Sequence, residues 1–351
     1  MINRRTFSKA AALGAGGAAV ALSGPQARAS AEATSPRPHR GPAPTVPAIT
    51  PGTHTAFATL KHVKAGVLDV GYAEAGPAHG PVVLCLHGWP YDIHSFVDVA
   101  PLLAGMGYRV IVPHLRGHGS TRFLSGRTPR TAEQSAVALD IVALMDALKI
   151  PRAVLAGFDW GSRTADVIAA LWPERVKALV STGGYLITDL KAQREPAAPA
   201  VEHTWWYQWY FATERGKRTM EDVDDRVALC RYVWTLVSPN WRFDDATFAR
   251  TAHAFRNPDY AAVVLYNYRW RIGLIEGEPR YDRYEKLLAA RPSLHVPTVT
   301  LDPFTQPGDG SAYRHHFTGP YAHRTIADVG HNLPQEAPTA FAQAVVDADH
   351  L

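Results

Sequence analysis

Asp159 stands where a chain could present a nucleophile. It is the centre of the segment Gly-Phe-Asp-Trp-Gly at 157–161, which follows an apolar run and precedes a helical pattern. Gly-x-nucleophile-x-Gly between a strand and a helix is typical of a nucleophile elbow, a sharp turn that exposes its central side chain above a sheet. An aspartate at this place could instead cap the helix. The five residues alone therefore leave both interpretations open.

Two further segments have the order that such a nucleophile requires. His-Gly-Trp-Pro at 87–90 follows an apolar run, as expected for a loop that supplies an N–H group to an oxyanion hole. His331 lies near the C-terminus after the last predicted strand, where a general base would fall. A single histidine is usually structural, and the chain has 16. The order and spacing of the three segments together favour the nucleophile.

A carboxylate nucleophile restricts the substrate. Attack on an acyl carbon would form an anhydride, whereas attack on an sp³ carbon forms an alkyl ester that water activated by His331 can cleave. The expected substrate therefore carries an epoxide or a carbon–halogen bond. Ser120 and Ser162 are not at the elbow position, which disfavours a serine esterase.

Alternating strands and helices must position these groups. Short apolar runs alternate with helical patterns in the first half of the chain, at 82–86, 109–112, 131–148, 153–156, 162–171 and 178–180. This alternation predicts a mostly parallel, doubly wound sheet covered on both faces. Residues 186–292 are helical and rich in aromatic residues, and strand patterns return afterwards. We expect a core of residues 52–185 plus 293–351, with a helical cap of 186–292 at the carboxyl ends of the strands.

From about residue 57 to 349 the sequence resembles the α/β-hydrolase family. Within it, the aspartate at the elbow resembles the branch of soluble-type epoxide hydrolases and of haloalkane and haloacetate dehalogenases. The resemblance implies Asp159 as nucleophile, His331 as base, and the backbone amides of Trp89 and Trp160 as the oxyanion hole. It implies no cofactor, and the sequence shows no metal-ligand spacing and no dinucleotide-binding or phosphate-binding loop.

The cap sequence bears on the choice between epoxide and halide. Residues 206–211 resemble the Tyr-Gln-x-Tyr-Phe stretch that carries one proton-donating tyrosine of epoxide hydrolases, which corresponds to Tyr207. Residues 267–269 resemble the stretch with the second, one residue shorter, which corresponds to Tyr268. Both could instead be core aromatics of the cap. We also expect substrate contacts from His87, Trp206, Tyr210 and Tyr266. If the register of the match shifts, Tyr210 and Tyr266 would replace Tyr207 and Tyr268 as proton donors.

A dehalogenase is the alternative. Haloalkane dehalogenases commonly have Asn where this chain has Trp89, whereas Trp160 is shared with them. Haloacetate dehalogenases carry Arg directly after the nucleophile and again four residues beyond it, and only the latter is present, as Arg163. The resemblance therefore favours the epoxide.

The acid that should orient His331 is the weakest part of the match. The branch places this acid in a Gly-x-x-Asp turn a few residues after the strand that corresponds to 296–301. Without any insertion or deletion, the position of the aspartate is occupied by Gln306. A shortened turn would make Asp302 the acid, and Asp309 is the second candidate. Without an acid, deacylation would be slow, and a catalytically weak protein that binds small molecules is the third hypothesis.

The N-terminal residues carry the basic excess of the chain. Lys and Arg number 36 against 32 Asp and Glu, a net charge of +4, but residues 1–50 carry +5 and the remainder sums to −1. No basic stripe is left for a nucleic acid. An uncharged, apolar small molecule is the expected substrate, and the sequence leaves the oligomeric state open.

Residues 1–29 resemble a twin-arginine export signal. They contain Arg4, Arg5 and Phe7, an uncharged stretch too short to span a membrane, and Ala-Arg-Ala at 27–29. We therefore expect export to the periplasm or the cell exterior, followed by a Pro-rich linker at 30–51. Cys85 and Cys230 are expected as thiols, because Cys85 lies inside an apolar run.

Overall fold

The computed structural model describes residues 41–303 and 309–351, which belong to one unit. The predicted export signal at 1–29 and the first part of the predicted linker lie outside the described residues, so export stays a prediction. None of the described helices combines the length and the apolar character needed to cross a bilayer.

The described residues build a nine-stranded sheet in the order β1-β2-β4-β3-β6-β7-β8-β9, with β5 paired to β2. Strands β1, β4 and β5 are antiparallel to β2, and the pairs from β4 through β9 are parallel. Strands β3 and β6 are almost wholly buried, as expected for the centre of a parallel sheet. The strand bounds are β1 Leu60–Ala65, β2 Leu68–Ala75, β3 Val82–Leu86, β4 Arg109–Pro113, β5 Arg122–Phe123, β6 Ala153–Phe158, β7 Val176–Thr182, β8 Thr298–Pro303 and β9 Tyr321–Ile326.

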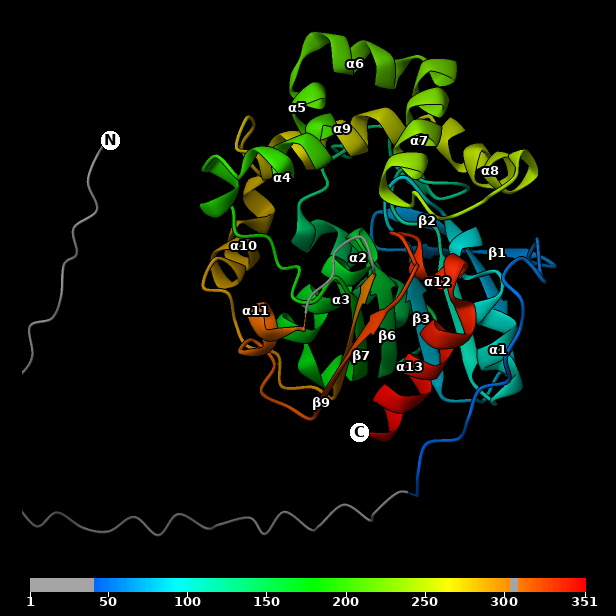
Figure 1. Cartoon of the computed structure of the whole chain (residues 1–351). Coiled ribbons are helices and arrows are strands. Elements are labelled where there is room, and N and C mark those ends of the chain that lie inside the picture. The colour runs from blue at the N-terminus through cyan, green and yellow to red at the C-terminus, as the bar shows by residue number, and fades with distance from the viewer. Residues whose placement is uncertain (1–40, 304–308) are drawn as a thin grey trace, which may run out of the picture. The chain divides into compact units, whose positions relative to one another are not determined.

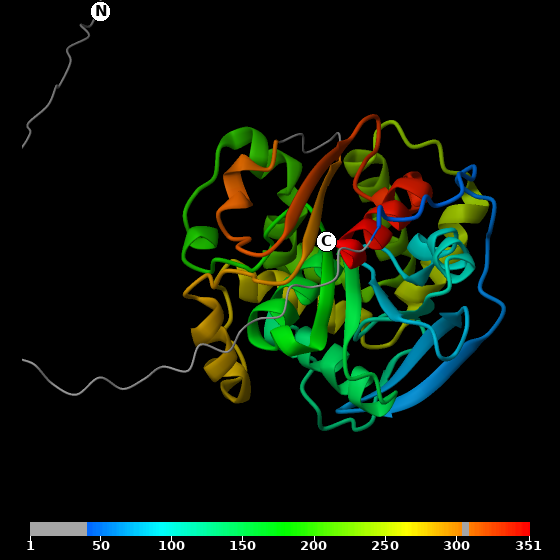
Figure 2. The ribbon, with the colours of Figure 1, turned by 90° about the horizontal axis from the view of Figure 1, so that it is seen from below.

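Helices pack on both faces of this sheet (Figure 2). On one face α2, α3 and α10 contact one another, and on the other α1 and α12 contact α13. Their bounds are α1 Val99–Gly105, α2 Gln134–Ala147, α3 Trp160–Leu171, α10 Asp282–Leu288, α12 Leu333–Glu336 and α13 Pro338–His350. A short helix, α11 (Ser311–Arg314), lies between β8 and β9. The predicted α/β fold is confirmed.

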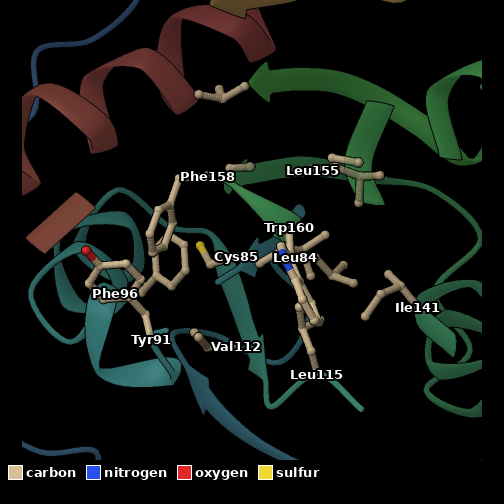
Figure 3. Packing of buried hydrophobic residues seen from close by; sticks show 14 of the residues in the cluster. Leu84, Cys85, Tyr91, Phe96, Val112, Leu115, Ile141, Leu155, Phe158 and Trp160 are labelled. Carbon is tan, nitrogen blue, oxygen red and sulfur yellow. The ribbon is translucent and has the colours of Figure 1, made fainter. Parts of the chain in front are cut away.

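Side chains of β3 alternate between the two faces of the core. Figure 3 shows Cys85 beside Phe96 and Phe158, whereas Leu84 lies on the side of Trp160. Cys85 and Cys230 are both buried and free, so the prediction of thiols is confirmed.

The helical cap lies above the carboxyl ends of the strands (Figure 1). It comprises α4 Pro199–Thr204, α5 Trp206–Ala212, α6 Glu214–Glu221, α7 Val223–Val237, α8 Asp245–Ala252 and α9 Tyr260–Arg271. Helix α10 also falls within the range predicted for the cap, but it packs on α2 and α3. The cap is therefore narrower than the predicted 186–292, because the chain rejoins the core one helix earlier.

The described part of the predicted linker packs on the core instead of extending into solvent. Val46 is 3% exposed, and its N–H donates to Gln343 Oε1 of α13 at 2.7 Å. The N–H groups of Ile49 and Gly52 donate to Thr339 Oγ1 and Asp98 Oδ2. The prediction that the folded domain begins near Gly52 is therefore wrong for Val46 and Ile49. The prolines of this segment prevent regular secondary structure, but N–H groups and apolar side chains between them still bind to the core.

Candidate active site

Asp159 occupies the turn between β6 and α3. Its φ of 52° and ψ of −119° lie in a region that non-glycine residues rarely adopt. Although it is the residue before α3, its side chain makes no helix-cap hydrogen bond. The carboxylate instead turns toward the loop after β3, where the N–H of Trp89 donates to Asp159 Oδ1 at 2.8 Å. The structure therefore selects the elbow over the helix cap.

Gly161 of the elbow and Gly88 of the loop after β3 allow these two segments to approach each other closely. A Cβ atom on Gly161 would lie 1.8 Å from the carbonyl oxygen of Leu86, and one on Gly88 would lie 2.4 Å from Asp159 Cβ. Any side chain at either position would push the β3 loop away from the elbow. The positive φ is borne by Asp159, so the backbone strain lies at the residue that the sequence predicts as the nucleophile.

His331 lies in the loop between β9 and α12, on the other side of the Asp159 carboxylate. Its Nε2 is 3.7 Å from Asp159 Oδ2, which is longer than a hydrogen bond. The imidazole stacks on Tyr91, with ring centroids 5.6 Å apart and planes inclined by 15°. The histidine is thus held beside the carboxylate without being tied to it.

Two residues that sequence reasoning missed hold the His331 loop. The N–H of His331 donates to Ser238 Oγ at 2.9 Å, and the Ser238 hydroxyl donates to Glu336 Oε1 at 2.7 Å. Glu336 also accepts hydrogen bonds from the N–H groups of Gly330 and Asn332. Glu336 could have been suspected from its place five residues after His331, but Ser238 belongs to the cap and has no sequence signal.

The environment of Asp159 keeps its carboxylate ionised. Burial raises the pKa of this group, but the nearby His331 imidazole, the charge of Arg163 and the Trp89 N–H group outweigh burial. The pKa of Asp159 falls to about 2 as a result. Asp159 is therefore negatively charged throughout the physiological pH range.

The structure does not bring either predicted acid to His331. Asp302 is 3% exposed in β8, but its Oδ1 accepts from the Tyr313 hydroxyl at 2.9 Å and its Oδ2 faces His323. Asp309 is exposed, and its Oδ1 accepts from the N–H of Ser311. Among the described residues, His331 Nδ1 has no hydrogen-bond partner. Segment 304–308, which follows β8 directly, is Phe-Thr-Gln-Pro-Gly and contains no carboxylate.

Tyr207 of α5 and Tyr268 of α9 close the site from the cap side. Their rings contact each other at a centroid distance of 5.7 Å, and both rings contact Trp89 of the β3 loop. Burial, followed by other groups that include the Asp159 charge, raises the pKa of each phenol. Both hydroxyls therefore keep their protons at neutral pH and are available as proton donors.

A cavity of about 490 Å³ joins these groups. Asp159, His331, Tyr207 and Tyr268 line it. Trp205, Leu186 and Val237 add apolar surface, and Arg163 and Arg271 add two guanidinium groups. The core and the cap thus each contribute side chains to one cavity beside Asp159.

Four predicted substrate contacts do not line this cavity. His87 is fully buried, and its ring nitrogens lie 2.9 Å from the carbonyl of Gly88 and 3.1 Å from the N–H of Leu115. The Tyr210 and Tyr266 hydroxyls pair with Thr219 and Glu133, respectively. Trp206 packs on Tyr207 and Tyr210 from behind. Helix geometry explains Trp206 and Tyr266, because residues one or two positions from Tyr207 and Tyr268 point to other sides of α5 and α9. Tyr210 lies one turn after Tyr207, and its hydroxyl is engaged by Thr219.

Trp160 presents its backbone rather than its ring to the elbow. It is the first residue of α3, directly after Asp159, which is the position predicted for the second oxyanion amide. Its indole is buried against Tyr268 and His118 and does not line the cavity. Within residues 41–303 and 309–351, no cluster of His, Cys, Asp and Glu has an arrangement that could hold a metal ion.

Comparisons with known proteins agree with this geometry. A family model described as alpha/beta hydrolase fold matches residues 81–338. The crystal structure of a "putative epoxide hydrolase" from Klebsiella pneumoniae superposes with a TM-score of 0.82 at 54% identity, over 84% of this chain and 99% of that one. Potato epoxide hydrolase I shares the fold, with a TM-score of 0.65 at 19% identity over 82% of this chain and 98% of that one.

Curated relatives match over a shorter stretch. Epoxide hydrolase 3 of Siraitia grosvenorii is 34% identical over 143 residues, which are 41% of this chain and 43% of that protein. Epoxide hydrolase B of Mycobacterium tuberculosis is 31% identical over 170 residues, 45% of this chain and 47% of that protein. The chain thus matches less than half the length of these relatives. The family model nevertheless spans most of the sequence, and the chain belongs to the α/β-hydrolase family as an epoxide hydrolase-like hydrolase.

Proposed function

We propose that this protein hydrolyses an epoxide to a diol through an ester on Asp159. The observation that carries the proposal is the pair of protonated phenols, Tyr207 and Tyr268, lining the same cavity as an ionised aspartate and a histidine. Opening an epoxide leaves an alkoxide, which needs a proton donor. The relatives named as epoxide hydrolases support the same assignment.

In the first half-reaction, Asp159 Oδ2 attacks the less hindered epoxide carbon. Oδ2 is the attacking atom because Oδ1 is held by the Trp89 N–H group. The C–O bond of the ring breaks, and the departing oxygen takes a proton from Tyr207 or Tyr268. The product is a hydroxyalkyl ester of Asp159 whose carbonyl oxygen is Oδ1.

In the second half-reaction, His331 Nε2 removes a proton from water as that water attacks the carboxyl carbon of the ester. The Trp89 N–H group, with the amide of Trp160, stabilises the negative charge that develops on Oδ1. The intermediate collapses, and the departing diol oxygen takes the proton held by His331. The Asp159 carboxyl group that remains releases its proton, which restores the tyrosine deprotonated in the first half-reaction. One epoxide and one water thus give one diol.

Two substitutions and an isotope test this mechanism. Asp159→Asn is expected to abolish diol formation from styrene oxide, and His331→Gln is expected to accumulate a covalent adduct with the mass of the epoxide. In a single turnover in oxygen-18 water, the label should enter Asp159 rather than the diol. Diol production by Asp159→Asn at the wild-type rate, or label found only in the diol, would refute the ester.

Dehalogenation of a haloacid is the second candidate, and the observation in its favour is Arg163 in the cavity. A halide leaves as an anion and needs no proton, so the two phenols would have no role in it. Release of chloride from chloroacetate, with no diol from styrene oxide, would establish this candidate instead.

The third hypothesis is a weak hydrolase that binds small molecules, and it is supported by His331 Nδ1, which has no hydrogen-bond partner among the described residues. Without an acid to stabilise the imidazolium, ester hydrolysis is expected to limit turnover. A burst of ester formation followed by a slow steady state distinguishes a slow enzyme from a binding protein, which would show thermal stabilisation by ligand without any adduct.

A further inference from the structure

Two buried arginines face the same cavity from opposite sides. Arg163 lies one helical turn after Asp159 in α3, and Arg271 is the last residue of the cap helix α9. They are 7% and 9% exposed. The guanidinium groups come from the core and from the cap, so the pair exists only where the two parts meet.

Neither guanidinium has a carboxylate partner of its own among the described residues. Arg163 Nε donates to the carbonyl of Leu186 at 3.2 Å. Arg271 lies 5.6 Å from the centre of the Tyr268 ring, and its buried Nε has no hydrogen-bond partner. Segment 304–308 cannot supply an acid, because its sequence contains none. A buried charge without a counter-ion is costly, which points to a ligand that supplies one.

The charges around the cavity do not balance. Asp159 is the only carboxylate among the described residues that line it, against two guanidinium groups. Asp166 lies close to Arg163, but burial raises the pKa of Asp166 to about 8, despite the hydrogen bond from the Leu186 N–H group and the charge of Arg163. Asp166 is therefore mostly neutral at pH 7. Among its carboxylates and guanidinium groups alone, the lining carries one positive charge in excess.

We propose that Arg163 and Arg271 bind a carboxylate carried by the substrate, so that the natural substrate is an epoxide with an acid group close to the ring. Guanidinium groups suit this role because they match the two oxygens of a carboxylate and remain charged when buried. This inference names the substrate class for the hydrolysis proposed above and rests on it. It replaces the uncharged, apolar substrate expected from composition.

A matched pair of substrates tests the subsite. Sodium trans-3-phenylglycidate and trans-3-phenylglycidamide differ in charge but little in size. The wild-type protein is expected to show a kcat/KM at least about tenfold higher for the acid, because charged hydrogen bonds are worth a factor of about ten to a hundred. Arg271→Gln and Arg163→Gln should each raise KM for the acid by about that factor, more than kcat falls, so that the preference disappears.

Two further variants separate charge from packing. Arg271→Lys keeps the charge and should retain part of the preference for the acid. Arg269→Gln is the matched control, because Arg269 lies two residues away on α9, donates to the carbonyl of Phe211 and does not line the cavity. It should leave the preference unchanged. Equal loss of preference in Arg269→Gln would overturn the assignment.

Binding without turnover keeps this inference separable from the proposed activity. Cinnamate and cinnamamide lack the epoxide, so calorimetry on the wild-type protein at pH 7 measures the subsite alone. Tighter binding of cinnamate by about tenfold or more, lost in Arg271→Gln, supports the subsite even if no epoxide is hydrolysed. Turnover of styrene oxide with equal affinity for cinnamate and cinnamamide overturns the subsite and leaves the hydrolase intact.

Discussion

At the residue scale, the two oxygens of Asp159 have different neighbours and therefore different roles. Oδ1 accepts the Trp89 N–H group, and Oδ2 lies 3.7 Å from His331 Nε2. In the mechanism proposed above, the oxygen that is already hydrogen-bonded becomes the carbonyl oxygen of the ester, where the same donor would stabilise the later negative charge. The free oxygen lies on the side from which the activated water must arrive.

If the proposed mechanism holds, both cap tyrosines contribute to protonation of the epoxide oxygen. Tyr207→Phe and Tyr268→Phe are each expected to slow ester formation, and the double variant should slow it by about a hundredfold to ten-thousandfold. Quenched-flow mass spectrometry of the adduct measures this step directly.

Tyr210→Phe serves as the control for the tyrosine variants. Its hydroxyl contacts Thr219 outside the cavity, so ester formation should not change. An unimpaired double variant would show that the phenols are structural and would favour the haloacid candidate.

At the element scale, the loop that carries His331 is held by a residue of the cap. Ser238 follows α7 and joins the His331 N–H group to the Glu336 carboxylate. Burial raises the pKa of Glu336, but its hydrogen bonds with Ser238, Gly330 and Asn332 oppose the effect. The position of His331 therefore depends on how the cap is seated on the core.

Ser238→Ala should affect the two half-reactions unequally. Loss of a buried partner of Glu336 costs about 1–3 kcal/mol of stability and loosens the His331 loop. We expect slower ester hydrolysis with unchanged ester formation, so that the adduct accumulates in rapid-quench experiments.

Thr235→Ala is the matched control, because the Thr235 hydroxyl donates to the carbonyl of Tyr232 on the exposed side of α7. A parallel slowing of both half-reactions in Ser238→Ala would show a general structural defect rather than a misplaced base.

At the scale of the whole molecule, the free energy of unfolding should depend on Asp166. Burial raises the pKa of Asp166 to about 8 in the folded chain, whereas an unfolded aspartate releases its proton near pH 4. Between these values the folded state binds the extra proton, so stability falls as pH rises, by at most about 1.4 kcal/mol per pH unit.

Asp166→Asn should flatten this dependence, which urea unfolding at pH 5, 7 and 9 would measure. The exposed Asp224 provides the control, because Asp224→Asn removes a carboxylate that lies outside the core. If Asp166→Asn lost stability in parallel with the wild-type protein as the pH rises, another group would be responsible.

Much of the site could be predicted because it depends on short-range spacing. The elbow, the His-Gly-Trp loop and the terminal histidine each follow a strand, and the carboxyl ends of neighbouring parallel strands meet at one edge of the sheet. Tyr207 and Tyr268 were placed by a sequence pattern within single helices. Their neighbours Tyr210 and Tyr266 were indistinguishable by composition; helix direction separates Tyr266 from Tyr268, and the contact with Thr219 separates Tyr210 from Tyr207.

The sequence by itself thus determined the fold class, the carboxylate at the elbow and the separation of core from cap, since each is encoded in local periodicity and turn chemistry. Only the tertiary structure decided which distant groups meet. It paired Asp302 with Tyr313 rather than His331, tied Ser238 to Glu336, and brought Arg271 to the cavity of Arg163. The physical reason is that burial and charge balance belong to contacts between segments far apart in the chain, and no local pattern records them.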